Sequence, residues 1–204
     1  WSYLINNCRS FSIGIKSTKL SIKSKLFLTN YSPWSVILFT RNIKSILQTS
    51  KLTSSIRRIF NDKNYPILVD QEVGRVNRLK DIISFDNLTS KFFGDMFVND
   101  LKKFKFFYKL FVDKTSYLLK SIGANINTTP VLDLKVKGAS TVIGDRSFSK
   151  NLNFTIISIY LLCIFFLSLT LSSHIGFLFF QCMHSKKNLE MVLLNINSII
   201  STST

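Results

Sequence analysis

Two short stretches of this 204-residue sequence place acidic and basic residues directly after an apolar run. In the first, the apolar run 67–69 stops at Asp70, and a polar loop with two arginines follows. The second, 142–149, has a similar composition and contains Arg146. A buried strand that ends at an acid delivers charged groups to the rim of an α/β fold. Taken alone, these residue types favour a simple interpretation, in which Asp70 caps its loop and the arginines pair with it.

The elements that must position these stretches follow from hydrophobic periodicity. Asp133 ends a third apolar run in the same way as Asp70. Right-handed crossovers would bring the ends of successive parallel strands, at 40–42, Asp70 and Asp133, to one face of a sheet. Residues 81–100 have a looser pattern and are expected only to supply packing residues. Apolar runs predict strands at 11–15, 36–39, 67–69 and 124–134, and amphipathic spacing predicts helices at 16–30, 43–60 and 101–122, the last ending at Gly123.

This alternation of strands and helices predicts an α/β fold with a parallel sheet. We favour a (β/α)8 TIM barrel, in which site residues follow the C-terminal ends of the strands. A doubly wound sheet is the alternative that periodicity leaves open. Four strands before residue 135 cannot close a barrel, so the prediction is an incomplete barrel, its N-terminal half.

Composition bears on the ligands and partners. The formal net charge is +16 with 27 Lys and Arg, which raises the question of nucleic acid or an anionic membrane. Lys, Asn, Ile and Phe are abundant while Gly and Pro are scarce, a bias typical of AT-rich coding, and no nucleic-acid-binding motif is present. We therefore predict no nucleic-acid partner. Three scattered cysteines and two histidines predict neither a disulfide framework nor a metal site, and no cofactor is expected.

Four ordered motifs resemble one known family. They are VILFTRN at 36–42, VDQEVGRVNRL at 69–79, PVLD at 130–133 and IGDRSF at 143–148. In order and spacing they are similar to bacterial β-N-acetylhexosaminidases of glycoside hydrolase family 3, over residues 11–150. The resemblance implies a (β/α)8 barrel in the cytoplasm and hydrolysis of O-glycosyl bonds. The enzymes of this family remove terminal N-acetylglucosamine from muropeptides during peptidoglycan recycling.

The resemblance also implies a substrate-binding set. Asp70 matches an acid that accepts hydrogen bonds from sugar hydroxyls, Arg78 matches a sugar-binding arginine, and Arg146 matches the arginine that reaches the same subsite. The expected ligand is an N-acetylglucosamine-containing saccharide. Val73 stands where the family has glycine. If that position needs a positive φ, a β-branched residue is strained there and the loop that carries Arg78 shifts.

The resemblance implies catalytic groups that this chain does not match. A retaining glycosidase needs a carboxylate nucleophile and a second group that protonates the leaving oxygen. The family supplies them from a histidine-containing segment, a His/Asp loop and a later strand end, and no residue here stands in those positions. We therefore assign no catalytic residue and expect a truncated fragment that is inactive on its own.

Beyond residue 150 the sequence changes character. Residues 154–173 hold no charge over twenty positions, which is long enough for a transmembrane helix. A frameshift in AT-rich DNA is the other interpretation, and the one we favour. The predicted organisation is an N-terminal extension at 1–10, the partial barrel at 11–150 and a hydrophobic helical tail at 151–204. The alternative function is a small membrane-anchored protein whose upstream domain binds a ligand in the cytosol.

Overall fold

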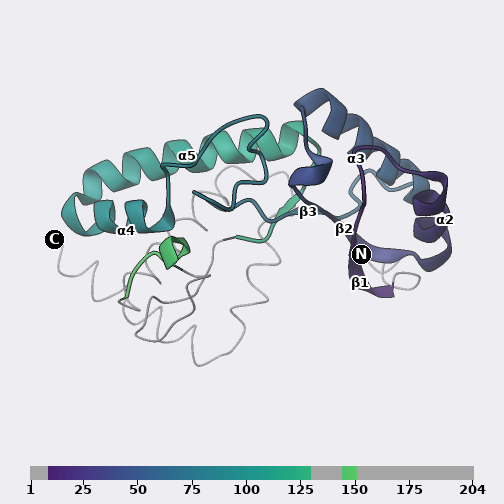
Figure 1. The fold of residues 1–204 in the computed structure, drawn as a ribbon, viewed down its shortest axis with the longest axis horizontal. Coiled ribbons are helices and arrows are strands. Elements are labelled where there is room, and N and C mark those ends of the chain that lie inside the picture. The colour runs from purple at the N-terminus through teal and green to yellow at the C-terminus, as the bar shows by residue number, and fades with distance from the viewer. Residues whose placement is uncertain (1–8, 130–143, 151–204) are drawn as a thin grey trace.

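The computed structural model describes residues 9–129 and 144–150, and its centre is an all-parallel sheet (Figure 1). Each strand pairs with its neighbour in sequence, in the order β1-β2-β3-β4. The shortest, β4, continues the register through Leu68 opposite Ile126 and Val69 opposite Asn127. The strands are β1 (Arg9–Gly14), β2 (Pro33–Leu38), β3 (Ile67–Val69) and β4 (Ile126–Asn127).

The helices begin at side-chain caps. In each of the four, a hydroxyl or carboxylate just before the first turn accepts a hydrogen bond from a backbone N–H that has no partner inside the helix. The caps are Ser21, Ser45, Thr89 and Asp100. They start α2 (Ile22–Tyr31), α3 (Ile46–Phe60), α4 (Ser90–Asn99) and α5 (Leu101–Ser121), and two 3-10 turns, η1 (Thr40–Asn42) and η2 (Gly144–Arg146), complete the elements.

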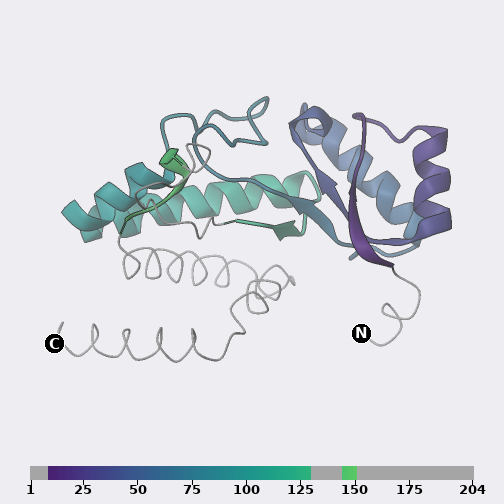
Figure 2. The ribbon, with the colours of Figure 1, turned by 60° about the horizontal axis from the view of Figure 1, so that its bottom comes forward.

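The strand order separates the two predicted architectures. A doubly wound sheet reverses its strand order at a switch point, which sends helices to both faces. Here the order is sequential, so right-handed crossovers put the helices on one face. Helix α3 accordingly contacts both α2 and α5, and Figure 2 shows α2 and α3 together beside β1 and β2. The described part of the chain therefore has the arrangement of a barrel segment, as predicted.

Several element boundaries differ from the predicted ones for local reasons. The first helix begins at Ile22 rather than at residue 16, because Ser21 caps it and residues 16–19 form a bend. Strand β2 begins at Pro33, three residues before the predicted strand at 36–39, because a proline is tolerated as the first residue of a strand. Helix α5 ends one residue before its predicted end, and Gly123 follows with a φ of 81° and donates its N–H to the Lys120 carbonyl.

Two apolar clusters form the core. The larger lies between the sheet and α2, α3 and α5, and includes Val36, Ile56 and Leu119. The smaller lies under α4 and α5 and includes Val73. Because Val73 belongs to the loop after β3, the second cluster holds that loop against the helices.

Some predictions fall outside the described residues. They include Asp133 with the rest of the fourth predicted strand, and residues 1–8 of the predicted extension. They also include the whole predicted tail at 151–204, with its segment 154–173. Among the described residues, no helix has both the length and the apolar character that crossing a membrane requires.

Candidate functional site

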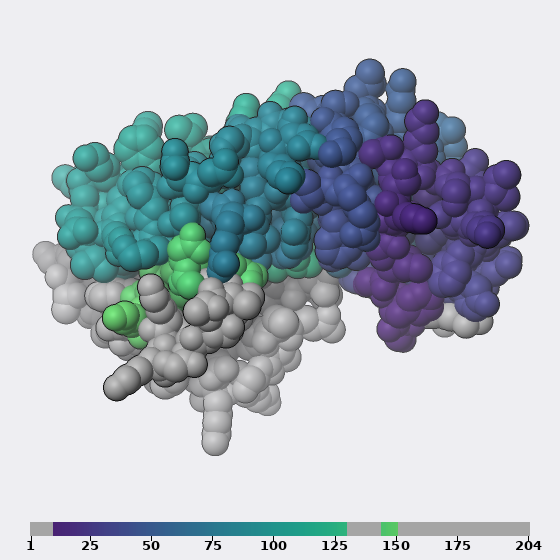
Figure 3. All heavy atoms as spheres, in the orientation of Figure 1, coloured from purple at the N-terminus to yellow at the C-terminus, as the bar shows by residue number. Residues whose placement is uncertain are grey.

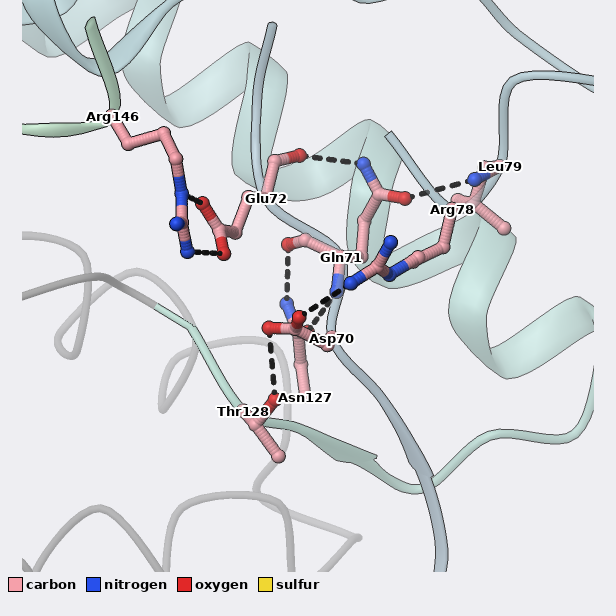
Figure 4. A network of polar contacts seen from close by, with 8 residues as sticks. All are labelled: Asp70, Gln71, Glu72, Arg78, Leu79, Asn127, Thr128 and Arg146. Carbon is pink, nitrogen blue, oxygen red and sulfur yellow. Dashed lines mark hydrogen bonds and ion pairs between the residues drawn. The ribbon is translucent and has the colours of Figure 1, made fainter. Parts of the chain in front are cut away.

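Buried polar side chains, Gln71 foremost, hold the loop 70–79 after β3 in shape. Gln71 is 1 % exposed, and its amide nitrogen donates to the Glu72 carbonyl at 2.6 Å while its amide oxygen accepts from the Leu79 N–H at 3.0 Å. The backbone N–H of Gln71 donates to the Asn127 side chain at 3.0 Å, and the Asn127 amide donates back to the Gln71 carbonyl at 3.3 Å (Figure 4). Gln71 thus joins the two ends of the loop, and Asn127 fixes the loop to the end of β4.

The first charged pair of the site joins the ends of this loop. The Arg78 Nη2 donates to the Asp70 Oδ2 at 2.9 Å, and the side chains are 26 % and 28 % exposed. The Thr128 hydroxyl, just past β4, donates to the other Asp70 oxygen at 3.2 Å. The Phe39 ring, just past β2, lies 5.6 Å from the Arg78 guanidinium carbon. Groups from the ends of three neighbouring strands therefore meet at Asp70 and Arg78.

The second charged pair joins the loop to the segment 144–150. Arg146 donates from Nε to one Glu72 oxygen at 2.7 Å and from Nη2 to the other at 2.6 Å. The Glu72 side chain is 4 % exposed and that of Arg146 is 21 % exposed. Two parallel hydrogen bonds between a guanidinium and a carboxylate form a strong, directional pair. Figure 4 shows this pair and the Asp70–Arg78 pair as separate contacts of the same loop.

A third, more exposed pair ties the same two segments together. Arg75 Nε lies 3.1 Å from the Asp145 Oδ1, with side chains 48 % and 42 % exposed. The Phe148 side chain is buried in the second core cluster beside Val73. Figure 3 shows residues 144–150 lying against the loop and helix region of the chain. The segment is therefore docked on the loop by both charge and apolar contact.

This arrangement suits the binding of a polar, hydroxyl-bearing ligand. Carboxylate oxygens accept hydrogen bonds from hydroxyls, and guanidinium groups donate them. In the part of the chain that the structure describes, no three His, Cys, Asp or Glu side chains gather in a way that could hold a metal ion.

The structure brings two of the three predicted site residues into direct contact. Asp70 and Arg78 pair with each other, whereas Arg146 pairs with Glu72 rather than with Asp70. The condition under which Val73 would be strained, a positive φ, is not met. The left-handed conformation belongs to the next residue, Gly74, with a φ of 62°.

Sequence reasoning did not single out Gln71, Glu72 or Asn127. The first two lie inside the quoted motif at 69–79, so the motif itself was the signal. The role of Asn127 depends on the pairing of β3 with β4, which the sequence does not specify residue by residue.

Comparison with known proteins identifies the family. The model of the glycosyl hydrolase family 3 N-terminal domain matches residues 12–158. The β-hexosaminidase of Thioalkalivibrio sulfidiphilus is 30 % identical over 140 residues, which is 68 % of this chain and 39 % of that protein. The β-hexosaminidase of Nitrosomonas eutropha is 34 % identical over 139 residues, 67 % of this chain and 38 % of that protein. The chain thus spans about two fifths of the length of these relatives.

Solved structures show the same fold. NagZ from Neisseria gonorrhoeae, in complex with N-trifluoroacetyl-D-glucosamine, superposes with a TM-score of 0.72 at 24 % identity, covering 84 % of this chain and 52 % of that one. A family 3 β-N-acetylglucosaminidase from Paenibacillus gives a TM-score of 0.64 at 22 % identity, covering 77 % of this chain and 29 % of that one. The chain belongs to glycosyl hydrolase family 3, and the site described above lies in its N-terminal domain.

Proposed function

We propose that the loop 70–79, together with Arg146, binds the N-acetylglucosamine unit of a saccharide, as the sugar-holding part of a β-hexosaminidase-type glycoside hydrolase. The curated relatives are named β-hexosaminidases, and a structural neighbour carries an N-acylated glucosamine derivative. The substrate expected from the family resemblance is a muropeptide met during peptidoglycan recycling in the cytoplasm.

The observation that carries the proposal is the half-buried Asp70–Arg78 pair at the C-terminal end of β3. In parallel α/β folds, ligands bind at this end of the strands. An ionised carboxylate has about four acceptor sites. The Asp70 oxygens accept one hydrogen bond each, from Arg78 and from Thr128, which leaves capacity for sugar hydroxyls.

The exposure of the pair supports the same conclusion. A side chain that is 28 % exposed remains accessible to a ligand, yet part of its solvation is already lost. Hydrogen bonds to such a carboxylate gain from the lower local dielectric. The Phe39 ring beside Arg78 adds an apolar surface at the rim.

Titration of the chain with N-acetylglucosamine, followed by NMR shifts or calorimetry, tests the proposal. We expect Asp70→Asn to weaken binding by about tenfold or more, because hydrogen bonds to a charged group contribute roughly 1.5–3 kcal/mol. Asp86→Asn, an exposed acid outside the loop, is the matched control and should bind as the unsubstituted chain does. Equal affinity of the Asp70 and Asp86 variants, or no binding by the unsubstituted chain, would contradict the proposal.

A further inference from the structure

Glu72 is the most deeply buried acid of the site, and the proposed function leaves it without a role. At 6 % exposure it is the one charged residue among the buried residues that the structure describes. Removing a carboxylate from water is costly unless it is paired and hydrogen-bonded. Both of its oxygens are engaged by Arg146.

The contact fixes the guanidinium in position and in orientation. A single hydrogen bond would let the guanidinium plane rotate, whereas two parallel bonds to one carboxylate define that plane. The bonds occupy Nε and Nη2, so they set one edge of the group. A ligand that meets Arg146 therefore meets a donor array that is hydrogen-bonded along one edge to Glu72.

Glu72 itself cannot move freely. Its carbonyl accepts the Gln71 amide at 2.6 Å, and the next residue, Val73, is buried in the second core cluster. Both sides of Glu72 are thus fixed, by a side-chain hydrogen bond before it and by apolar packing after it. The folded loop thus fixes Glu72, and Glu72 in turn holds Arg146 in place.

We infer that Glu72 is a positioning residue for Arg146, which holds the guanidinium in the orientation that the sugar requires. The inference rests on the proposed function for its ligand. Glu72 is not in the predicted substrate-binding set. It orients Arg146, a member of that set that lies 74 positions further along the sequence.

A purely structural role would be that Glu72 only ties the segment 144–150 to the loop. The chain provides a comparison for that role. Arg75 and Asp145 tie the same two segments at 3.1 Å without involving Arg146. Phe148 also anchors the segment through the second core cluster. If tethering were the whole contribution, removing either charged pair would have the same kind of effect on sugar binding.

The experiment compares Glu72→Gln with Asp145→Asn in the full 204-residue chain. Each change replaces an acid by its amide and breaks one ion pair between the same segments. The first readout is the Nε–H NMR signal of Arg146 without sugar, assigned by its loss in Arg146→Lys. The second is the dissociation constant for N-acetylglucosamine. A double variant, Glu72→Gln with Arg146→Lys, tests whether Glu72 acts through Arg146.

We expect Glu72→Gln to shift and broaden the Arg146 Nε–H signal and to weaken sugar binding by about ten- to hundredfold. Asp145→Asn should leave the signal in place and change affinity less than about twofold, because the Arg75–Asp145 pair does not contact Arg146. In the Arg146→Lys background, Glu72→Gln should cause no further loss of affinity. An unchanged Arg146 signal in Glu72→Gln, equal losses in both single variants, or full additivity in the double variant would overturn the inference.

Failure of the inference and failure of the proposed function give different results. If the unsubstituted chain binds no sugar, the proposed function fails and the affinity argument fails with it, while the sugar-free Arg146 signal still decides whether Glu72 orients the guanidinium. If Glu72→Gln does not fold by circular dichroism, Glu72→Asp replaces it. That variant keeps the charge but is one methylene too short for the same two contacts, so it should also shift the signal and weaken binding; wild-type behaviour in it would contradict the inference.

Discussion

The structure gives Val73 a different role from the one that the sequence suggested. The family resemblance placed a glycine there and suggested strain, but the left-handed conformation belongs to Gly74. Val73 is 8 % exposed and lies in the cluster that contains Phe93 and Phe148. A side chain at this position therefore contributes apolar contacts to the loop that carries Asp70 and Arg78.

The substitution Val73→Gly tests this directly. We expect it to lower the free energy of unfolding by about 2–4 kcal/mol, because it removes buried methyl groups and adds backbone freedom to the unfolded chain. Urea unfolding followed by circular dichroism measures the change. Val98→Ala, at an exposed position of α4, should stay within about 0.5 kcal/mol. Greater stability of Val73→Gly would restore the strain interpretation.

At the scale of elements, the sequence predicted best where local signals agreed. Helix α5 shows a long apolar stripe and a terminal glycine, and its predicted and observed ends differ by one residue. Helix α4 was not predicted, since its aromatic residues do not follow one clean period. It forms with a Thr89 cap and with Phe93 and Gly94 turned to the protein interior.

The same distinction applies to the site. The contact between Asp70 and Arg78 was predictable from one contiguous motif, because the two residues lie eight positions apart in one loop. The partner of Arg146 was not, because it depends on how the segment 144–150 docks. Contacts across such a separation are decided by tertiary packing, which periodicity and motif spacing do not encode.

Gly94 makes this docking testable. A Cβ at this position would lie 1.9 Å from the Phe148 carbonyl oxygen. Helix α4 can therefore pack closely against the segment 144–150 only because residue 94 has no side chain. Gly→Ala in a helix usually stabilises by up to about 1 kcal/mol. Here we expect Gly94→Ala to destabilise by about 1–3 kcal/mol, as overpacking does.

Thermal or urea unfolding measures the effect of Gly94→Ala. Lys105→Ala, at an exposed position of α5, serves as the control and should change stability little. A gain in stability for Gly94→Ala would mean that the segment does not lie against α4.

At the scale of the whole molecule, the described residues form four parallel strands of a barrel-type sheet and one side of a candidate site. Of the acids in that site, Asp70, Glu72 and Asp145 are each paired with an arginine. Glycoside cleavage needs a nucleophile and a proton donor, and the family resemblance implies that this sequence has no counterpart of either.

We therefore expect this 204-residue chain to release no nitrophenol from 4-nitrophenyl N-acetyl-β-D-glucosaminide, even where it binds N-acetylglucosamine. Absorbance of nitrophenolate measures the reaction. The β-hexosaminidase of Nitrosomonas eutropha, assayed in parallel, shows that the assay works. Measurable release that Asp70→Ala abolishes would show that the chain carries its own catalytic groups.

The two ion pairs between the loop and the segment 144–150 have opposite polarity, with an acid at Glu72 facing a base and a base at Arg75 facing an acid. Sliding the segment by one residue would set Asp145 against Glu72 in one direction, or Arg146 against Arg75 in the other. Either slip replaces an attraction by a like-charge repulsion. In the first, water screens the repulsion little because the Glu72 side chain is only 4 % exposed. The alternating charges therefore favour the observed alignment of the two segments over alignments shifted by one residue.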